Sequence, residues 1–170
     1  MKKISFILLT IICFSINAQN SLQDGVSPYN SFFGVGIYDQ DSYNEIEFKN
    51  TQYSDAVVCL VNYFSGKTIR NEYINKGNTF KMTKIPNGTY MVKVFYGNDC
   101  NPDKVLANGK IVGGYNFDES FSISDDHTDL LKLNQYESSD GINYSVYEVM
   151  LFTVQNGNMD QRKISEDEFF

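Results

Sequence analysis

The stretch that most constrains the fold is residues 86–97, which read PNGTYMVKVFYG. Its Pro-Asn-Gly start predicts a tight turn, because proline fixes φ and Asn-Gly tolerates the backbone that such turns require. Apolar and other side chains then alternate with a period of two, which places alternate residues on opposite faces of a strand. We therefore predict a central β-strand with one face in a core. The side chains expected on that face are Tyr90, Val92, Val94 and Tyr96.

Further short runs of strand-forming residues recur along the chain at intervals of about 8–12 residues. The run 55–64, DAVVCLVNYF, is almost continuously apolar, which is typical of a strand buried on both faces. After the first 18 residues, no stretch repeats apolar residues with helical spacing over three turns. These patterns predict an all-β fold, a single antiparallel β-sandwich of about seven to eight strands of the Ig-like or prealbumin-like kind. The other expected strands are 45–50, 68–74, 79–85, 111–117, 119–124, 129–136 and 142–154.

The first 18 residues have the pattern of a secretory signal peptide. Lys2 and Lys3 precede an apolar run, and Ala18 is the small residue expected before a cleavage site. The apolar run is about 13 residues long, shorter than the roughly 20 that span a bilayer. We expect cleavage after Ala18, no membrane span in the remaining chain, and a secreted or periplasmic protein.

The expected domain organisation follows from these segments. Residues 1–18 are the signal peptide, and residues 19–44 form an N-terminal lead-in rich in Ser, Asn, Gly and Asp. Residues 45–155 form the β-sandwich domain, and residues 156–170 form an acidic C-terminal tail.

Charge limits the choice of partners. The chain has 14 basic and 21 acidic residues, and loss of Lys2 and Lys3 with the signal peptide leaves a formal net charge of −9. Such a surface repels phosphate backbones, so nucleic acid and anionic membranes are poor candidates. We expect a protein or a glycan at the cell exterior as the partner.

Two cysteines remain after cleavage, Cys59 and Cys100. An oxidising compartment favours a disulfide between them. Cys59, however, lies in the apolar run 55–64, where a cysteine is usually a small buried hydrophobic residue. The alternatives are therefore a Cys59–Cys100 disulfide or two separate thiols.

The segment after the central strand is the candidate binding site. Residues 98–103, NDCNPD, gather side-chain oxygens in what reads as the longest internal loop, 97–109. We predict Asn98, Asp99, Asn101 and Asp103 as binding residues. Calcium, which prefers several oxygen ligands, is an alternative here and at the acidic stretches 39–45 and 124–129. Ordinary turn chemistry is favoured at all three, because Asp and Asn side chains bond their local backbone.

Catalytic chemistry has few candidates. His127 is the single histidine, so a zinc site with several nitrogen and sulfur ligands is excluded and a catalytic triad would depend on it. A small hydrolase or enzyme accessory domain would instead need loop carboxylates that converge in one cleft. The candidates are Asp39, Asp41, Asp99, Asp103, Asp125 and Asp126.

A family resemblance covers roughly 45 residues, from position 55 to position 96. A strand, a Gly-Lys turn, a second strand, a glycine, a Phe-containing strand and an Ile-Pro-x-Gly-x-Tyr motif follow one another. The matching residues are Gly66, Lys67, Gly77, Phe80, Ile85, Pro86, Gly88 and Tyr90. This order resembles the transthyretin-like β-sandwich modules of carboxypeptidase regulatory-like domains and of the B-type repeats of collagen adhesins. The resemblance implies a β-sandwich that serves as a spacer, an adhesin or an appended binding domain in a small secreted bacterial protein.

The favoured functional hypothesis is thus an exported, non-catalytic binding, adhesion or structural module. One alternative is a periplasmic inhibitor or immunity-type protein whose acidic surface attracts a basic partner. The other is the carboxylate hydrolase or accessory domain. No cofactor is expected, with calcium as the exception named above.

Overall fold

The computed structural model describes residues 22–105, 109, 113–124, 129–152 and 159–170. The signal peptide 1–18 and its cleavage site after Ala18 lie outside these residues. Two short helices, α1 (Asn30–Phe33) and α2 (Glu166–Phe169), accompany a fold made otherwise of strands and loops. No helix in the described part of the chain is both long and apolar enough to cross a membrane.

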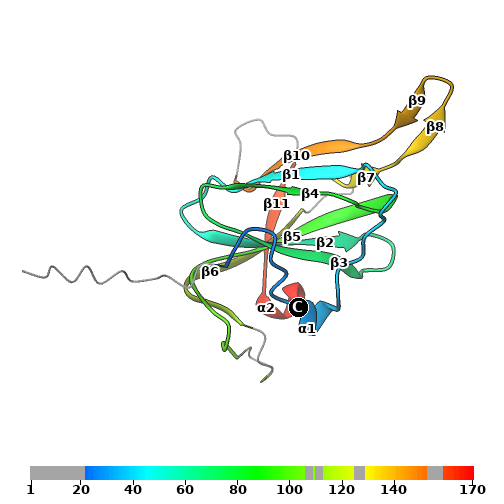
Figure 1. Cartoon of the computed structure of the whole chain (residues 1–170). Helices are drawn as coiled ribbons and strands as arrows, with labels where there is room; N and C mark the ends of the chain where they lie inside the picture. Colours follow the sequence, from blue (N-terminus) through cyan, green and yellow to red (C-terminus); the bar gives the residue numbers. More distant parts are fainter. Residues whose placement is uncertain (1–21, 106–108, 110–112, 125–128, 153–158) are drawn as a thin grey trace, which may run out of the picture.

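The strands form two packed layers, as Figure 1 shows. The smaller layer has the order β10 (Val146–Met150), β1 (Glu45–Lys49), β4 (Thr79–Met82). The larger layer has the order β11 (Gln161–Ile164), β6 (Gly114–Ser124), β5 (Gly88–Asn101), β2 (Asp55–Asn62), β3 (Thr68–Ile74), and β7 (Leu131–Leu133) pairs with the start of β5. A separate hairpin joins β8 (Tyr136–Ser138) to β9 (Gly141–Asn143).

The predicted all-β sandwich of antiparallel sheets is confirmed. Two details differ from the prediction. The described residues contain eleven strands rather than seven or eight, and β1 pairs with β10 in parallel. The count differs for three reasons. The expected strand 142–154 is divided into β9 and β10, and the expected strand 129–136 into β7 and the start of β8. β11 lies in the expected tail, whereas the expected strands 111–117 and 119–124 correspond to the single strand β6.

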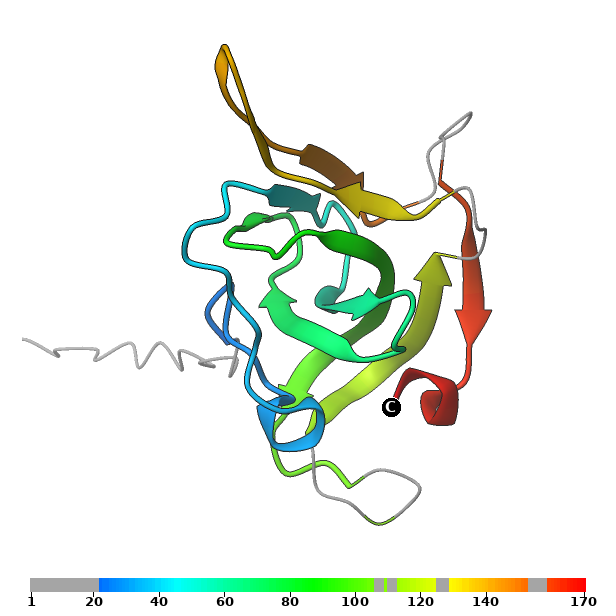
Figure 2. The ribbon, with the colours of Figure 1, turned by 90° about the vertical axis from the view of Figure 1, so that its right-hand side faces the viewer.

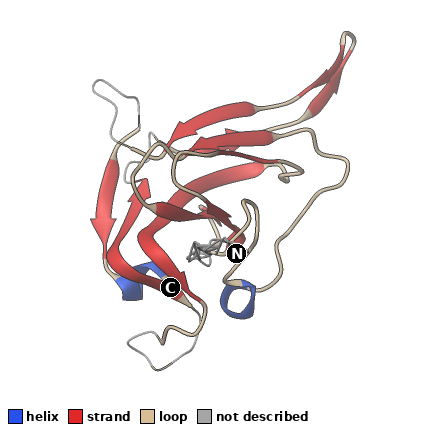
Figure 3. Ribbon diagram, turned by 60° about the vertical axis from the view of Figure 1, so that its left-hand side comes forward, coloured by secondary structure: helices blue, strands red, loops and turns tan. Residues whose placement is uncertain are grey.

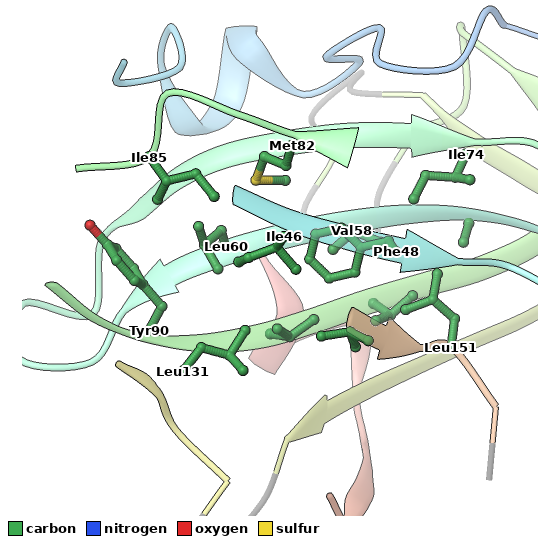
Figure 4. Close-up of a cluster of buried hydrophobic side chains, with 14 of the residues drawn as sticks. Ile46, Phe48, Val58, Leu60, Ile74, Met82, Ile85, Tyr90, Leu131 and Leu151 are labelled. Carbon is green, nitrogen blue, oxygen red and sulfur yellow. The ribbon is translucent and has the colours of Figure 1, made fainter. Parts of the chain in front are cut away.

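The main core fills the space between the two layers (Figure 4). Ile46 and Phe48 of β1 point into it from the smaller layer, and Val58 and Leu60 of β2 point into it from the larger one. The four side chains predicted on the core face of β5 are all buried in this cluster, which confirms the alternation: Tyr90, Val92, Val94 and Tyr96.

The larger sheet is also covered on its outer face. Strand β2 sends Val57, Cys59 and Val61 to that face, all at most 2% exposed, so the prediction of a strand buried on both faces is confirmed. The cover is an aromatic cluster contributed by distant parts of the chain. Its members are Tyr29, Phe32, Phe33, Phe95, Tyr115, Phe121, Phe169 and Phe170.

The two ends of the described chain meet in this aromatic cluster, where the ring centres of Phe33 in α1 and Phe169 in α2 are 6.3 Å apart (Figure 1). The ring of Tyr29 lies 5.1 Å from that of Phe170, and Phe169 is 1% exposed. The expected boundaries therefore need correction. The predicted lead-in 19–44 packs on the sheet from residue 22, and the predicted acidic tail 156–170 contributes β11 and α2 to the folded domain.

One ion pair is buried at the edge of the main core. The guanidinium of Arg70 contacts the carboxylate of Glu72, with the two side chains 4% and 1% exposed. Arg70 also donates to the carbonyl of Thr83 at 2.9 Å and stacks on Tyr38, its Cζ 3.8 Å from the ring centre. The second oxygen of Glu72 has no hydrogen-bond partner among the described residues.

Candidate functional site

The predicted binding loop after the central strand is mostly strand. β5 continues to Asn101 and pairs with β6 beyond a register shift between Tyr96 and Asn98. We call residues 97–105 and 113–119 the β5–β6 arm. It extends beyond the sandwich at the bottom of Figure 2. The prediction of a loop at 98–101 is therefore wrong, because β6 supplies a partner for these polar residues.

Along the arm, the predicted binding residues bond to one another and to β6. Asn116 donates from its side-chain amide to Asp99 at 2.9 Å and accepts from Asn101 at 3.2 Å. Asn101 in turn accepts from the backbone N–H of Asp103 at 3.0 Å. The fourth residue, Asn98, is separate from this group and donates to Asp118. These contacts are the turn and ladder chemistry expected of Asn and Asp, and they occupy Oδ2 of Asp99 and Oδ1 of Asn101.

The predicted calcium alternative has no assembled ligand set in the described residues, where no three His, Cys, Asp or Glu side chains are grouped to hold a metal ion. In the stretch 39–45, Asn44 is fully buried and donates to the side chain of Asn87, and Glu45 pairs with Lys81. Most of the stretch 124–129, including His127, lies outside the described residues.

The carboxylates of the hydrolase hypothesis lie at two ends of β5. The backbone of Asp39 bonds to Lys84, just before β5, and the backbone carbonyl of Asp41 accepts from Gln135, which bonds Asn87. Asp99 is near the opposite end of β5, eleven residues after Gly88, and Asp103 follows it on the arm. The described carboxylates therefore form two separate groups, one near each end of β5. Asp125 and Asp126 lie outside the described residues.

Cys59 and Cys100 are both free thiols. The register explains why. Cys59 lies opposite Lys93 of β5, four residues or roughly 13 Å of strand before Gly97, and Cys100 follows beyond the register shift between Tyr96 and Asn98. A disulfide needs Cα atoms within about 7 Å, so the alternative of a Cys59–Cys100 disulfide is wrong for this fold. Burial raises the pKa of both thiols, which keeps them protonated at neutral pH.

A pocket of about 150 Å³ lies between the arm and the N-terminal segment. Val26 and Pro102 line it from exposed positions. Tyr29, Val57 and Tyr115 line it from buried ones, at 1–2% exposure. Cys100 of the arm also contributes to the wall.

Tyr115 is the most unusual residue of this pocket. Its hydroxyl is buried and has no hydrogen-bond partner among the described residues. Its ring lies against Gly97, where an added Cβ would come within 2.3 Å of the ring and of Tyr115 Cβ. Only glycine therefore allows the ring to lie on the backbone of β5 at this point. Burial raises the pKa of the hydroxyl, with the neighbouring Tyr29 and Tyr73 acting in the same direction, so Tyr115 stays protonated.

A second feature is the β8–β9 hairpin, which projects from the sandwich in Figures 1, 2 and 3. Every residue of its two strands is exposed. Ile142, Tyr144 and Val146 follow one another at two-residue spacing and are 46–57% exposed. The ring of Tyr144 lies 5.8 Å from that of Tyr43, itself 53% exposed.

We call these four residues the hairpin stripe: Tyr43, Ile142, Tyr144 and Val146. Sequence reasoning did not single out Ile142, Tyr144 or Val146, although Asp140-Gly141 is a recognised hairpin signal. Nothing in the sequence indicates that the hydroxyl of Tyr115 is buried without a described hydrogen-bond partner, because its burial depends on the fold of the N-terminal segment.

Comparisons with models of protein families, with curated proteins and with solved structures found no match for this chain. The resemblance to transthyretin-like modules therefore remains a hypothesis that rests on the motif residues between positions 55 and 96.

Proposed function

We propose that this chain is an exported β-sandwich module that binds a protein partner in the periplasm or at the cell exterior, through the hairpin stripe. The export part of the proposal rests on the signal-peptide pattern of residues 1–18. The binding part rests on the β8–β9 hairpin. A transthyretin-like module used as an appended binding domain is compatible with both.

The single observation that carries the proposal is a projecting hairpin with no buried residue. An isolated two-stranded hairpin is marginally stable in water, so it gains order when a partner covers it. The hairpin and its base expose Ile142, Tyr144 and Val146 together with Tyr43. Contiguous exposed apolar side chains with aromatic members are typical of protein interfaces.

A protein partner is favoured over a glycan by the composition of the stripe and of the chain. The chain contains no tryptophan, the side chain that most often forms a platform for sugars. Tyrosine and isoleucine side chains beside the free edges of a two-stranded sheet suit a protein surface, which also supplies backbone groups for strand pairing.

The test is site-specific photocrosslinking in the cells that produce the protein. A photoreactive amino acid is placed at position 142 or 144, and at the matched control positions 53 and 64. The controls carry Tyr53 and Phe64, aromatic residues that are 94% and 81% exposed away from the stripe. We expect one adduct of defined mass from positions 142 and 144 that is absent from 53 and 64.

The partner identified from the adduct is then purified on its own. Its affinity is measured for the unmodified protein and for the variants Tyr144→Ala and Tyr53→Ala. Loss of a central aromatic contact weakens binding at least tenfold, whereas the control variant leaves it unchanged. Equal adducts at all four positions, or no adduct at 142 and 144, would refute the proposal.

A further inference from the structure

The hairpin stripe lies along a strand edge. Among the described residues β10 is an edge strand of the three-stranded sheet, and it follows β9 directly along the chain (Figure 1). We call residues 141–150 the β9–β10 border. An edge strand carries backbone N–H and C=O groups that no neighbouring strand uses, so it is a template for pairing with another chain. The border therefore offers backbone groups to a partner as well as the side chains of the stripe.

The pairing of β10 with β1 shows which backbone groups face outward. The carbonyl of Ser145 accepts from the backbone N–H of Glu45 at 3.1 Å, and the N–H of Leu151 donates to the carbonyl of Lys49 at 3.0 Å. The odd-numbered residues of β10 therefore direct their backbone groups towards β1. Because successive residues of a strand direct these groups to opposite sides, the even-numbered residues direct theirs away from β1.

The even-numbered residues of the border also carry its exposed apolar side chains: Ile142, Tyr144 and Val146 are 46–57% exposed. Natural edge strands are commonly protected from pairing by proline, by lysine or by other charged side chains. Residues 141–150 include no proline and no lysine, and their one charged side chain, Glu148, is paired with Lys49. Nothing in the border itself therefore opposes the addition of a strand.

We infer that the partner of the hairpin stripe is a second copy of this chain, whose β9–β10 border pairs with the same border in antiparallel fashion about a two-fold axis at Ser145. This inference rests on the proposed function, because it names the partner of the same surface. With the axis at Ser145, Tyr144 of each copy lies opposite Val146 of the other, and cross-strand pairs of an aromatic and a β-branched residue are favourable. With the axis at Tyr144, Glu148 would lie opposite Asp140, and like charges in that arrangement are destabilising.

The acidic character of the chain does not oppose this pairing. Antiparallel strands place the two hairpin turns at opposite ends of the interface, so that Asp140 of one copy lies beside Met150 of the other. The two Asp140 side chains are then about ten residues of strand apart, roughly 33 Å, whereas the Debye length at physiological salt is about 8 Å. A second copy is favoured over another protein because the border is complementary to itself, and because a two-fold contact of one edge with itself closes at two copies.

The test is sedimentation-velocity ultracentrifugation of the purified full protein from about 1 μM to 1 mM, the affinity range of small interfaces. We expect a reversible equilibrium between monomer and dimer. Val146→Pro removes an outward N–H that the pairing with β1 does not use, and edge strands tolerate proline at such positions. The control Val146→Ala keeps this N–H. Because each copy loses one hydrogen bond, we expect Val146→Pro to weaken dimerisation at least about fivefold relative to the control.

A second pair of variants tests the register at exposed positions, where a change of side chain does not disturb the fold. The double variant Tyr144→Lys with Val146→Glu places opposite charges across the two-fold axis twice. The double variant Tyr144→Glu with Val146→Glu places like charges there and removes the same apolar side chains. We expect the first to dimerise at least about fivefold more tightly than the second.

The outcomes separate this inference from the proposed function. A protein that stays monomeric over the whole range, but forms an adduct with a different protein from positions 142 and 144, overturns the inference and leaves the proposed function intact. A dimer that is equally stable in both members of each pair of variants also overturns the inference, because it forms elsewhere on the chain. The absence of any adduct from positions 142 and 144 refutes the proposed function and the inference together.

Discussion

The buried pair of Arg70 and Glu72 gives the sharpest stability prediction, through the change Arg70→Met. Methionine keeps much of the length of the side chain but removes the charge. Three favourable contacts are lost: the ion pair with Glu72, the hydrogen bond to the carbonyl of Thr83, and the stacking on Tyr38. Removing one partner of a buried pair costs about 3–5 kcal/mol, because it leaves an uncompensated charge. We expect a loss of about 4 kcal/mol in the free energy of unfolding at pH 7.

Urea unfolding followed by circular dichroism measures this loss. The matched control is the double variant Arg70→Met with Glu72→Leu, which removes both charges. Replacing a whole buried pair by apolar residues is often neutral or stabilising, so we expect the double variant to lie within about 1 kcal/mol of the unmodified protein. The difference between the two variants isolates the cost of the unpaired carboxylate.

The pH dependence gives a second readout of the same cause. Burial raises the pKa of Glu72, while Arg70 beside it acts in the opposite direction. Removing Arg70 therefore raises this pKa further. A carboxyl with a higher pKa in the folded chain destabilises the fold most above that pKa, and the penalty is relieved as the pH falls toward the unfolded value of about 4.3.

The Arg70→Met protein should consequently recover stability relative to the unmodified protein between neutral pH and about pH 4.3. A loss that is the same at every pH, or a double variant as unstable as the single one, would refute the reasoning. Either result would mean that packing rather than charge determines the effect of the substitution.

Three further substitutions test the outer face of the sheet by thermal or urea unfolding. Tyr115→Phe removes a buried hydroxyl without a described partner, and we expect stabilisation of about 1–2 kcal/mol; a loss would show that the hydroxyl is satisfied. Phe169→Ala removes a buried ring and should cost about 3–5 kcal/mol, against less than about 0.5 kcal/mol for the exposed control Phe64→Ala. Gly97→Ala must displace the ring of Tyr115 and should cost about 1–3 kcal/mol, so a neutral result would contradict the close approach.

The two central strands could be predicted from local pattern alone. The continuous burial of 55–62 and the burial of Tyr90, Val92, Val94 and Tyr96 follow directly from apolar continuity and alternation. The alternation does not predict the burial of Phe95 on the opposite face, which the aromatic cluster covers. The extension of β5 through Asn98 and Cys100 could not be predicted in this way. Asn and Asp are rare in strands. Asn98 and Cys100 belong to β5 because β6 pairs with them, while Asp99 between them has a positive φ of 58°.

The prediction of an acidic C-terminal tail is wrong for a different reason. Its acidic residues 166–168 suggest a solvated tail, yet Ser165 caps α2 by accepting from the backbone N–H of Glu168. The sequence Ser-x-x-Glu before two phenylalanines is a readable helix-start signal. Charge is therefore a misleading guide here: the acidic side of the turn faces solvent, and Phe169 enters the aromatic cluster.

The base of the β8–β9 hairpin is joined to the folded domain beside β5. Gln135 donates from its backbone N–H to the side chain of Asn87, immediately before β5. Cys100 lines the pocket near the other end of this strand. Along its length β5 pairs in turn with β7, β2 and β6, so we expect a substitution in the hairpin stripe to leave the far end of β5 unchanged.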